Sequence, residues 1–182
     1  MTIHCDVPLI GICAFSGTGK TTLLERLIPL LKGRGLRLAL LKHAHHDFEI
    51  DHPGKDSYQL RKAGAEQVLV ASRQRVALIR ESHGPQREPR LSELLPYIDT
   101  SGLDLILVEG FKRESIPKIE LYRPLLGHPL IHATDHHVVA VASDAPLVPA
   151  RDLPLLDLND PINVASFIVD RIGVGACLAR AV

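Results

Sequence analysis

The chain has no excess of charge of either sign. Its 182 residues include 21 lysines and arginines and 21 aspartates and glutamates, so the formal net charge is zero when histidine is neutral. Without a global positive field, nothing in the composition would attract nucleic acid or an anionic membrane surface. We therefore predict a protein without a nucleic acid partner and without a membrane partner.

Long apolar runs and a cysteine framework are also missing. No apolar stretch approaches the ~18 residues of a membrane-spanning helix, and no basic segment precedes a signal-like apolar core. Cys5, Cys13 and Cys177 are scattered and odd in number, which is typical neither of a disulfide framework nor of a C-x-x-C metal site. This pattern favours a reducing compartment, and we predict a cytoplasmic protein.

Short apolar runs alternate with helical patterns, which predicts an α/β fold with a mainly parallel central sheet. The expected strands are 8–14, 36–42, 67–71, 76–80, 103–108, 118–121, 138–142 and 155–158. The expected helices are 20–32, 55–63, 91–97 and a last one that starts at Pro161 behind an Asp160 N-cap. Strands 67–71 and 76–80 are close enough in sequence to form an antiparallel hairpin. The length fits a single nucleotide-binding domain over residues 1–172, followed by a loose tail over 173–182.

Residues 14–22, AFSGTGKTT, directly follow the apolar run 8–13 and carry the strongest signal in the chain. They match the phosphate-binding pattern G-x-x-x-x-G-K-[ST], except that Ala14 stands at the first glycine position. Gly17 and Gly19 let backbone N–H groups approach phosphate oxygens in conformations that a Cβ would hinder. The segment therefore predicts a P-loop between a strand and a helix.

The residues after the second glycine supply the remaining phosphate chemistry. Lys20 is expected to reach the β- and γ-phosphates, and the Thr21 hydroxyl to ligate Mg²⁺. Thr21 and Thr22 open a helix whose N-terminal dipole favours an anion. A nucleotide with Mg²⁺ is thus the predicted ligand.

A carboxylate follows a second buried strand. The apolar run 103–108 ends in Glu109 and Gly110. Because the carboxyl ends of parallel strands share one edge of a sheet, Glu109 is expected beside the P-loop, where it could hold Mg²⁺ directly or through water. Lys112 and Arg113 follow closely and lie next to the expected phosphates.

Two further segments leave alternatives open. Residues 42–56, KHAHHDFEIDHPGKD, could be a transition-metal site or a polar switch loop around the nucleotide, with Asp47 or Asp51 orienting a metal-bound water; we favour the loop. Asp144 follows the strand 138–142 and could accept hydrogen bonds from guanine N1 and N2, or could simply close a strand-end turn. Lys55, Arg61 and Lys62 are interpreted as a solvated helix face or as contacts to an anionic substrate.

Taken together, the motifs resemble one family. The segments SGTGKTTLLERLIPLL, LLKHAHHDFEIDHPGKDSYQLRKAGA, DLILVEGFK and VVAVASD are similar to those of the molybdopterin-guanine dinucleotide biosynthesis protein B family. The resemblance implies a three-layer P-loop NTPase fold. It also assigns nucleotide contacts to Ser16, Gly17, Thr18, Gly19, Lys20, Thr21 and Thr22, and it matches Glu109 as the strand-end carboxylate.

The same resemblance implies a function. Such proteins are expected to be dimers that bind GTP with Mg²⁺, hydrolyse it slowly, and assist a separate guanylyltransferase that attaches GMP to molybdopterin. Molybdopterin itself and molybdoenzyme-maturation proteins are further candidate partners. Lys20 is then the expected catalytic cation, with Asp47 and Asp51 as loop acids.

Two alternatives use the same P-loop. An ATP-dependent small-molecule kinase or ligase would need an acceptor pocket above the phosphates. A metallochaperone GTPase would deliver a transition metal from His43, His45, His46 and His52, and would bind metal in a fixed stoichiometry.

Overall fold

The structure is a computed structural model that describes residues 3, 5–44, 48–82 and 87–173. The chain forms two compact units, one made of Met1–His43 with Pro89–Val182 and the other of Ala44–Glu88, which we call unit 1 and unit 2. The single domain expected over 1–172 stays a prediction, and most of the expected tail lies outside the described residues. Within the described part of the chain, no helix is long and apolar enough to cross a membrane.

Unit 1 is built on a six-stranded sheet in the order β2-β5-β1-β6-β7-β8, and every neighbouring pair is parallel. Its strands are β1 Leu9–Cys13, β2 Leu38–Lys42, β5 Leu105–Glu109, β6 Lys118–Tyr122, β7 Val138–Ser143 and β8 Leu155–Asp157. The predicted α/β class with a mainly parallel sheet is confirmed. Strand β1 lies between β5 and β6, where the strand order reverses. Open α/β sheets bind ligands at such a position, beyond the carboxyl ends of their strands.

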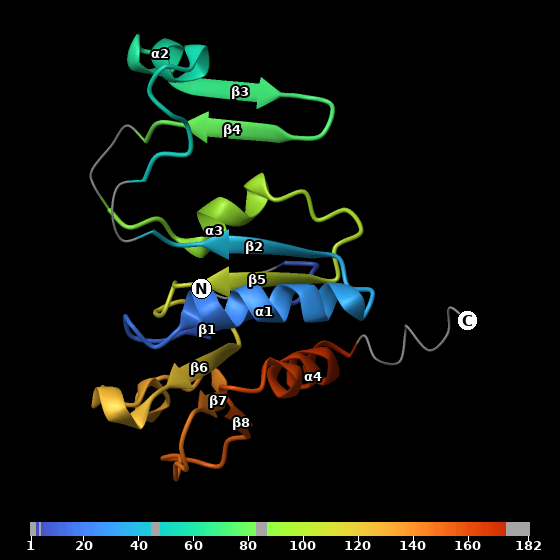
Figure 1. The fold of residues 1–182 in the computed structure, drawn as a ribbon, viewed down its shortest axis with the longest axis vertical. Coiled ribbons are helices and arrows are strands. Elements are labelled where there is room, and N and C mark those ends of the chain that lie inside the picture. Colours follow the sequence, from blue (N-terminus) through green and yellow to red (C-terminus); the bar gives the residue numbers. More distant parts are fainter. Residues whose placement is uncertain (1–2, 4, 45–47, 83–86, 174–182) are drawn as a thin grey trace. The chain divides into compact units, whose positions relative to one another are not determined.

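Helices cover both faces of this sheet, which gives the predicted three layers (Figure 1). The helical segments of unit 1 are α1 Lys20–Gly33, α3 Leu91–Leu94, η1 Leu95–Tyr97, η2 Pro124–Leu126, η3 Ile131–Ala133 and α4 Pro161–Ile172. On one face, α1 and α4 pack side by side on the alternate apolar residues of the strands. On the other face, α3 and η1 bury Leu91 and Leu95 against Ile106 and Val108 of β5.

Local capping chemistry sets the ends of the long helices. Asp160 caps α4 by accepting a hydrogen bond from the Ile162 N–H at 3.0 Å, with Pro161 at the first helical position, as predicted. The chain leaves α1 through Gly35, whose φ of 85° is a left-handed conformation that favours glycine.

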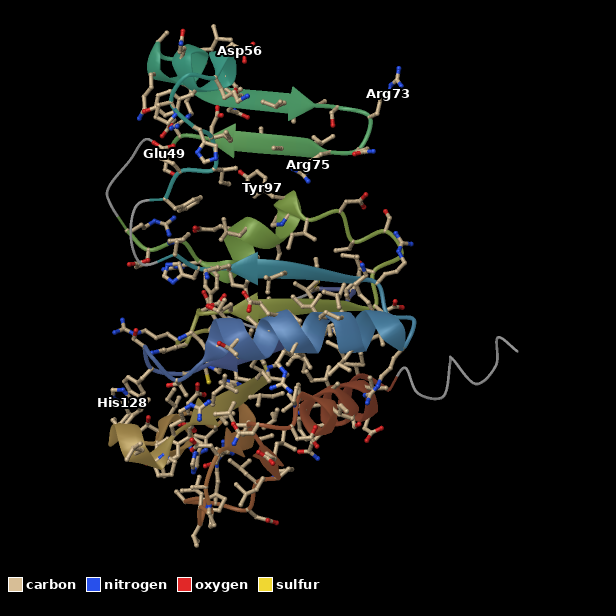
Figure 2. The ribbon with its side chains drawn as sticks, viewed as in Figure 1. Glu49, Asp56, Arg73, Arg75, Tyr97 and His128 are labelled. Carbon is tan, nitrogen blue, oxygen red and sulfur yellow. The ribbon has the colours of Figure 1, made fainter. Side chains whose placement is uncertain are left out.

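Unit 2 consists of α2 Asp56–Lys62 and the antiparallel hairpin of β3 Gln67–Ala71 and β4 Val76–Arg80. Arg61 on α2 is buried and forms ion pairs with Glu49 and Glu81, the latter at 2.6 Å. Figure 2 shows Glu49 at the end of the hairpin that carries α2, with Arg73 in the turn at the opposite end. The sequence interpretation of Arg61 as part of a solvated helix face was therefore wrong, because its charge is neutralised inside this unit.

Candidate nucleotide-binding site

The P-loop adopts the backbone conformations that its glycines permit. Gly17 and Gly19 have φ angles of 79° and 101°, in the left-handed region. Gly19 is also the N-cap of α1, and its carbonyl accepts the first helical hydrogen bond, from the Leu23 N–H at 3.0 Å. Since α1 has no side-chain cap at this end, its first N–H groups stay available to an anion.

The side chains of the loop divide into supporting and presented groups. Thr18 is 2% exposed, and its hydroxyl donates to the Phe15 carbonyl at 2.9 Å, so it braces the loop from inside. Ser16, Thr21 and Thr22 are exposed. Lys20 places Nζ 3.4 Å from the carbonyl oxygens of Ala14 and Phe15. Those distances are long for hydrogen bonds, so the protein holds this ammonium group only weakly.

The loop has room for a phosphate chain. An ideal Cβ built on Gly17 would meet no atom within 4 Å, and one built on Gly19 would meet only Arg123 Nη2, at 3.6 Å. Two left-handed glycines with room around them, and a loosely held lysine in the same loop, suit the phosphates of a nucleotide. The residues of the P-loop therefore fit the predicted ligand class.

Glu109 lies at the same sheet edge, as expected from its position at the end of β5. It stands opposite Ile12 of β1 on one side and Lys42 of β2 on the other. Its carboxylate is mostly buried and forms an ion pair with Lys42, Nζ to Oε2, at 3.2 Å. The apolar pattern of the strand predicted the position of Glu109 at this edge. It did not identify Lys42 as the partner of Glu109, because the two residues lie in strands that are distant in sequence.

The chain bends sharply after Glu109. Gly110 and Phe111 have φ angles of 88° and 47°, and a Cβ on Gly110 would lie 2.8 Å from the Cβ of His43. His43 donates its N–H to the Glu109 carbonyl at 2.9 Å, and its ring lies 4.9 Å from that of Phe111. This close approach of the chain ends of β2 and β5 is the structural reason for glycine at position 110.

The histidine-rich loop shows no metal cluster where the structure describes it. Among the described residues, no group of three or more His, Cys, Asp or Glu side chains could hold a metal ion. Asp47, His45 and His46 lie outside those residues. Asp51 belongs to unit 2, where its Oδ1 accepts the His52 N–H at 2.9 Å. The proposed roles of Asp47 and Asp51 at the phosphates stay predictions.

Arg123, just after β6, connects the P-loop to Asp144. Its Nε donates to the Thr18 carbonyl at 2.9 Å, and its Nη1 lies 2.5 Å from Asp144 Oδ2. The strand-end carboxylate that we assigned to guanine is thus tied to the phosphate loop through one guanidinium group. Its contact with the base stays a prediction.

Lys112 and His128 flank the same loop at Phe15. Lys112 Nζ lies 4.4 Å from the centroid of the Phe15 ring, and the ring of His128 stacks on Phe15 with the two centroids 4.6 Å apart. Burial, and then the positive charge of Lys20, lower the pKa of Lys112. Although the chain is neutral overall, the surroundings of its P-loop are locally cationic.

Comparison with known proteins agrees with this geometry. The family model of Molybdopterin guanine dinucleotide synthesis protein B, MobB, matches residues 9–144. The Molybdopterin-guanine dinucleotide biosynthesis adapter protein of Escherichia coli (strain K12) is 55% identical over 165 residues, covering 90% of this chain and 93% of that protein. The protein of the same name from Haemophilus influenzae is 44% identical over 163 residues, covering 90% and 88%.

Solved structures of related proteins share the fold. A crystal structure of molybdopterin-guanine biosynthesis protein B aligns with a TM-score of 0.70 at 25% identity, covering 91% of this chain and 99% of that one. A structure of Bacillus subtilis MobB aligns with a TM-score of 0.67 at 26% identity, covering 90% and 97%. The family match spans the P-loop, Glu109, Arg123 and Asp144. The chain belongs to the MobB family of molybdopterin-guanine dinucleotide biosynthesis proteins.

Proposed function

We propose that this protein is a GTP-binding adapter that assists the attachment of GMP to molybdopterin and hydrolyses GTP slowly. The observation that carries the nucleotide part is the open, glycine-lined P-loop with Lys20 held only weakly beside it. The pathway part is supported by the relatives, which are named as adapter proteins of molybdopterin-guanine dinucleotide biosynthesis. A cytoplasmic location, as predicted from the sequence, agrees with this role.

Magnesium would bind between the protein and the phosphates. Mg²⁺ prefers a small number of protein oxygens together with phosphate oxygens and water. The exposed Thr21 hydroxyl in the first turn of α1 and the Glu109 carboxylate at the end of β5 supply such oxygens at one edge of the sheet. In this structure Lys42 forms an ion pair with Glu109, so Mg²⁺ would have to displace the lysine from at least one oxygen of that carboxylate.

The expected partners are a second copy of this chain and the molybdopterin guanylyltransferase. In unit 2, Leu69 and Leu78 stand opposite each other in the hairpin and are 65% and 46% exposed. A two-stranded sheet with a bare apolar face is marginally stable alone, and a second copy could cover this face in a homodimer. An adapter role then requires that the guanylyltransferase dock elsewhere on the dimer.

The first experiment measures the affinity of fluorescent GTP and ATP analogues, with and without Mg²⁺, for the wild type and for Lys20→Ala. Lys20 lies outside the core, so the variant should fold normally, which circular dichroism can verify. We expect Mg²⁺-dependent preference for GTP and a loss of roughly a hundredfold in Lys20→Ala, since a charge-assisted contact to phosphate disappears. Unchanged affinity in the variant would refute the P-loop assignment, and preference for ATP would favour the kinase or ligase.

A further inference from the structure

Two lysine ammonium groups lie against the same residue of the P-loop. Lys20 Nζ is 3.4 Å from the main-chain oxygen of Phe15, and Lys112 Nζ is 4.4 Å from the centroid of its ring. The two lysines come from different segments, the start of α1 and the turn after β5. The tertiary fold, and not a single sequence motif, therefore brings the two ammonium groups to Phe15.

Neither ammonium group has a carboxylate partner among the residues that the structure describes. The nearby acids are already engaged, because Glu109 pairs with Lys42 and Asp144 pairs with Arg123. Burial, and then repulsion from Lys20, lower the pKa of Lys112. An anion placed between the two lysines would remove this repulsion.

A buried lysine fixes the segment that carries Lys112. Lys118 of β6 is 1% exposed, and its Nζ donates to the carbonyl oxygens of Lys112 and Glu114 at 2.8 and 2.7 Å. Asp135 Oδ2 lies 2.5 Å away and neutralises the charge. Gly11 of β1 makes room for this side chain, because a Cβ there would lie 2.6 Å from Lys118 Cγ.

We propose that Lys112 is a second phosphate-binding lysine, which grips the terminal phosphates of a nucleoside triphosphate together with Lys20, and that Lys118 is the positioning residue that sets the turn carrying it. The assignment rests on the proposed function, since it requires a triphosphate in the P-loop. The cation–π contact with Phe15 holds the ammonium group at the loop, and binding of phosphate turns an unfavourable pair of like charges into a two-sided clamp.

The test compares Lys112→Met with Lys32→Met, which removes the same side chain from an exposed position in the last turn of α1, at the end of the helix opposite the P-loop. Affinities for GTP, GDP and GMP are measured with Mg²⁺ by calorimetry. We expect Lys112→Met to weaken GTP binding by roughly tenfold to a hundredfold, GDP binding less and GMP binding little, because the lost contact serves the terminal phosphates. Lys32→Met should stay within roughly twofold of the wild type, as is usual for an exposed charge.

Restoration of charge provides the second arm. Lys112→Arg should recover much of the GTP affinity that Lys112→Met loses. Equal GTP affinity in Lys112→Met and Lys32→Met would overturn the proposal. An equal loss for GTP and GMP would overturn it too, because it would indicate a general effect on the loop. A wild type that binds no triphosphate would instead refute the proposed function itself, so the two failures are distinguishable.

Discussion

Lys42 and Glu109 close adjacent strands of the sheet with an ion pair of 3.2 Å, the lysine ending β2 and the glutamate ending β5. The lysine side chain is 54% exposed and the glutamate side chain 9%. The carboxylate that we propose for Mg²⁺ is therefore paired with a lysine in this structure. If Glu109 serves the metal as proposed, Mg²⁺ would have to compete with Lys42 for this carboxylate.

Lys42→Met should raise the apparent affinity for Mg²⁺ in the presence of GTP by a few-fold, because a half-exposed ion pair contributes roughly 1 kcal/mol or less. Titration of Mg²⁺ into the protein with a fluorescent GTP analogue measures this affinity.

Glu109→Gln should make nucleotide binding less dependent on Mg²⁺ and leave the fold intact. Wild-type Mg²⁺ dependence in Glu109→Gln would show that the carboxylate does not serve the metal.

Variants of Asp144 and Arg123 should separate the proposed base recognition from support of the P-loop. Asp144→Asn should reduce the preference for GTP over ATP, since an amide cannot accept hydrogen bonds at both positions from guanine N1 and N2. Arg123→Ala removes the link to the Thr18 carbonyl and should weaken both nucleotides, by roughly tenfold. Competition binding with GTP and ATP measures both the selectivity between the two nucleotides and the affinity for each. Full GTP selectivity in Asp144→Asn would mean that another group reads the base.

Gly11→Ala should destabilise the protein by about 1–3 kcal/mol, the range of overpacked cores, because the new Cβ would meet Lys118 Cγ at 2.6 Å. Urea unfolding with an unchanged slope is the appropriate measurement. Gly33→Ala is the matched control, since nothing lies within 4 Å of its ideal Cβ and it sits in α1. That variant should be neutral or slightly more stable; equal destabilisation of both would contradict the packing argument.

Cys13 should make the folded state sensitive to alkaline pH. Burial, and then the charge of Glu120, raise the pKa of its thiol to about 12 from an ordinary value of 9.0. The unfolded chain therefore loses this proton near pH 9 while the folded chain keeps it, so unfolding releases a proton and stability falls as pH rises from about 9 to about 12. Cys13→Ala should show a shallower decline in denaturant unfolding across this range, and an identical decline would exclude the thiol as the cause.

Reactivity gives an independent check on the same thiol. A buried, protonated Cys13 should resist alkylation at pH 8 until the protein unfolds, whereas the partly exposed Cys5 should react in the native state. Mass spectrometry of the labelled peptides distinguishes the two sites. Rapid native labelling of Cys13 would contradict its burial.

Sequence patterns predicted the features that local chemistry determines. The strands Gln67–Ala71 and Val76–Arg80 and the capped start of α4 occur at the predicted residues, because turn and capping residues act over a few positions. The P-loop and the strand-end Glu109 were likewise readable, since a strand, a glycine turn and a helix follow one another in the chain.

The pairings that join distant segments were not predictable. Arg61 with Glu81, Lys118 with Asp135, and Arg123 with Thr18 each link residues that no periodicity relates. The same holds for His132, which is 1% exposed. Its Nδ1 lies 2.7 Å from Glu120 Oε2, and its Nε2 accepts the Ala150 N–H at 3.0 Å. Such buried polar groups look like surface residues in a sequence until the fold supplies their partners.

The place of β1 in the sheet has a consequence for biosynthesis. The P-loop is synthesised before β5 and β6, yet β1 takes its pairing partners from these two later strands. A strand that is apolar on both faces is not stable in water without these neighbours. A ribosome-bound chain that ends before Tyr122 thus carries the whole phosphate motif but lacks the complete pair of neighbouring strands that holds β1 in place. The ability to bind nucleotide therefore arises late in folding, when β5 and β6 pair with β1.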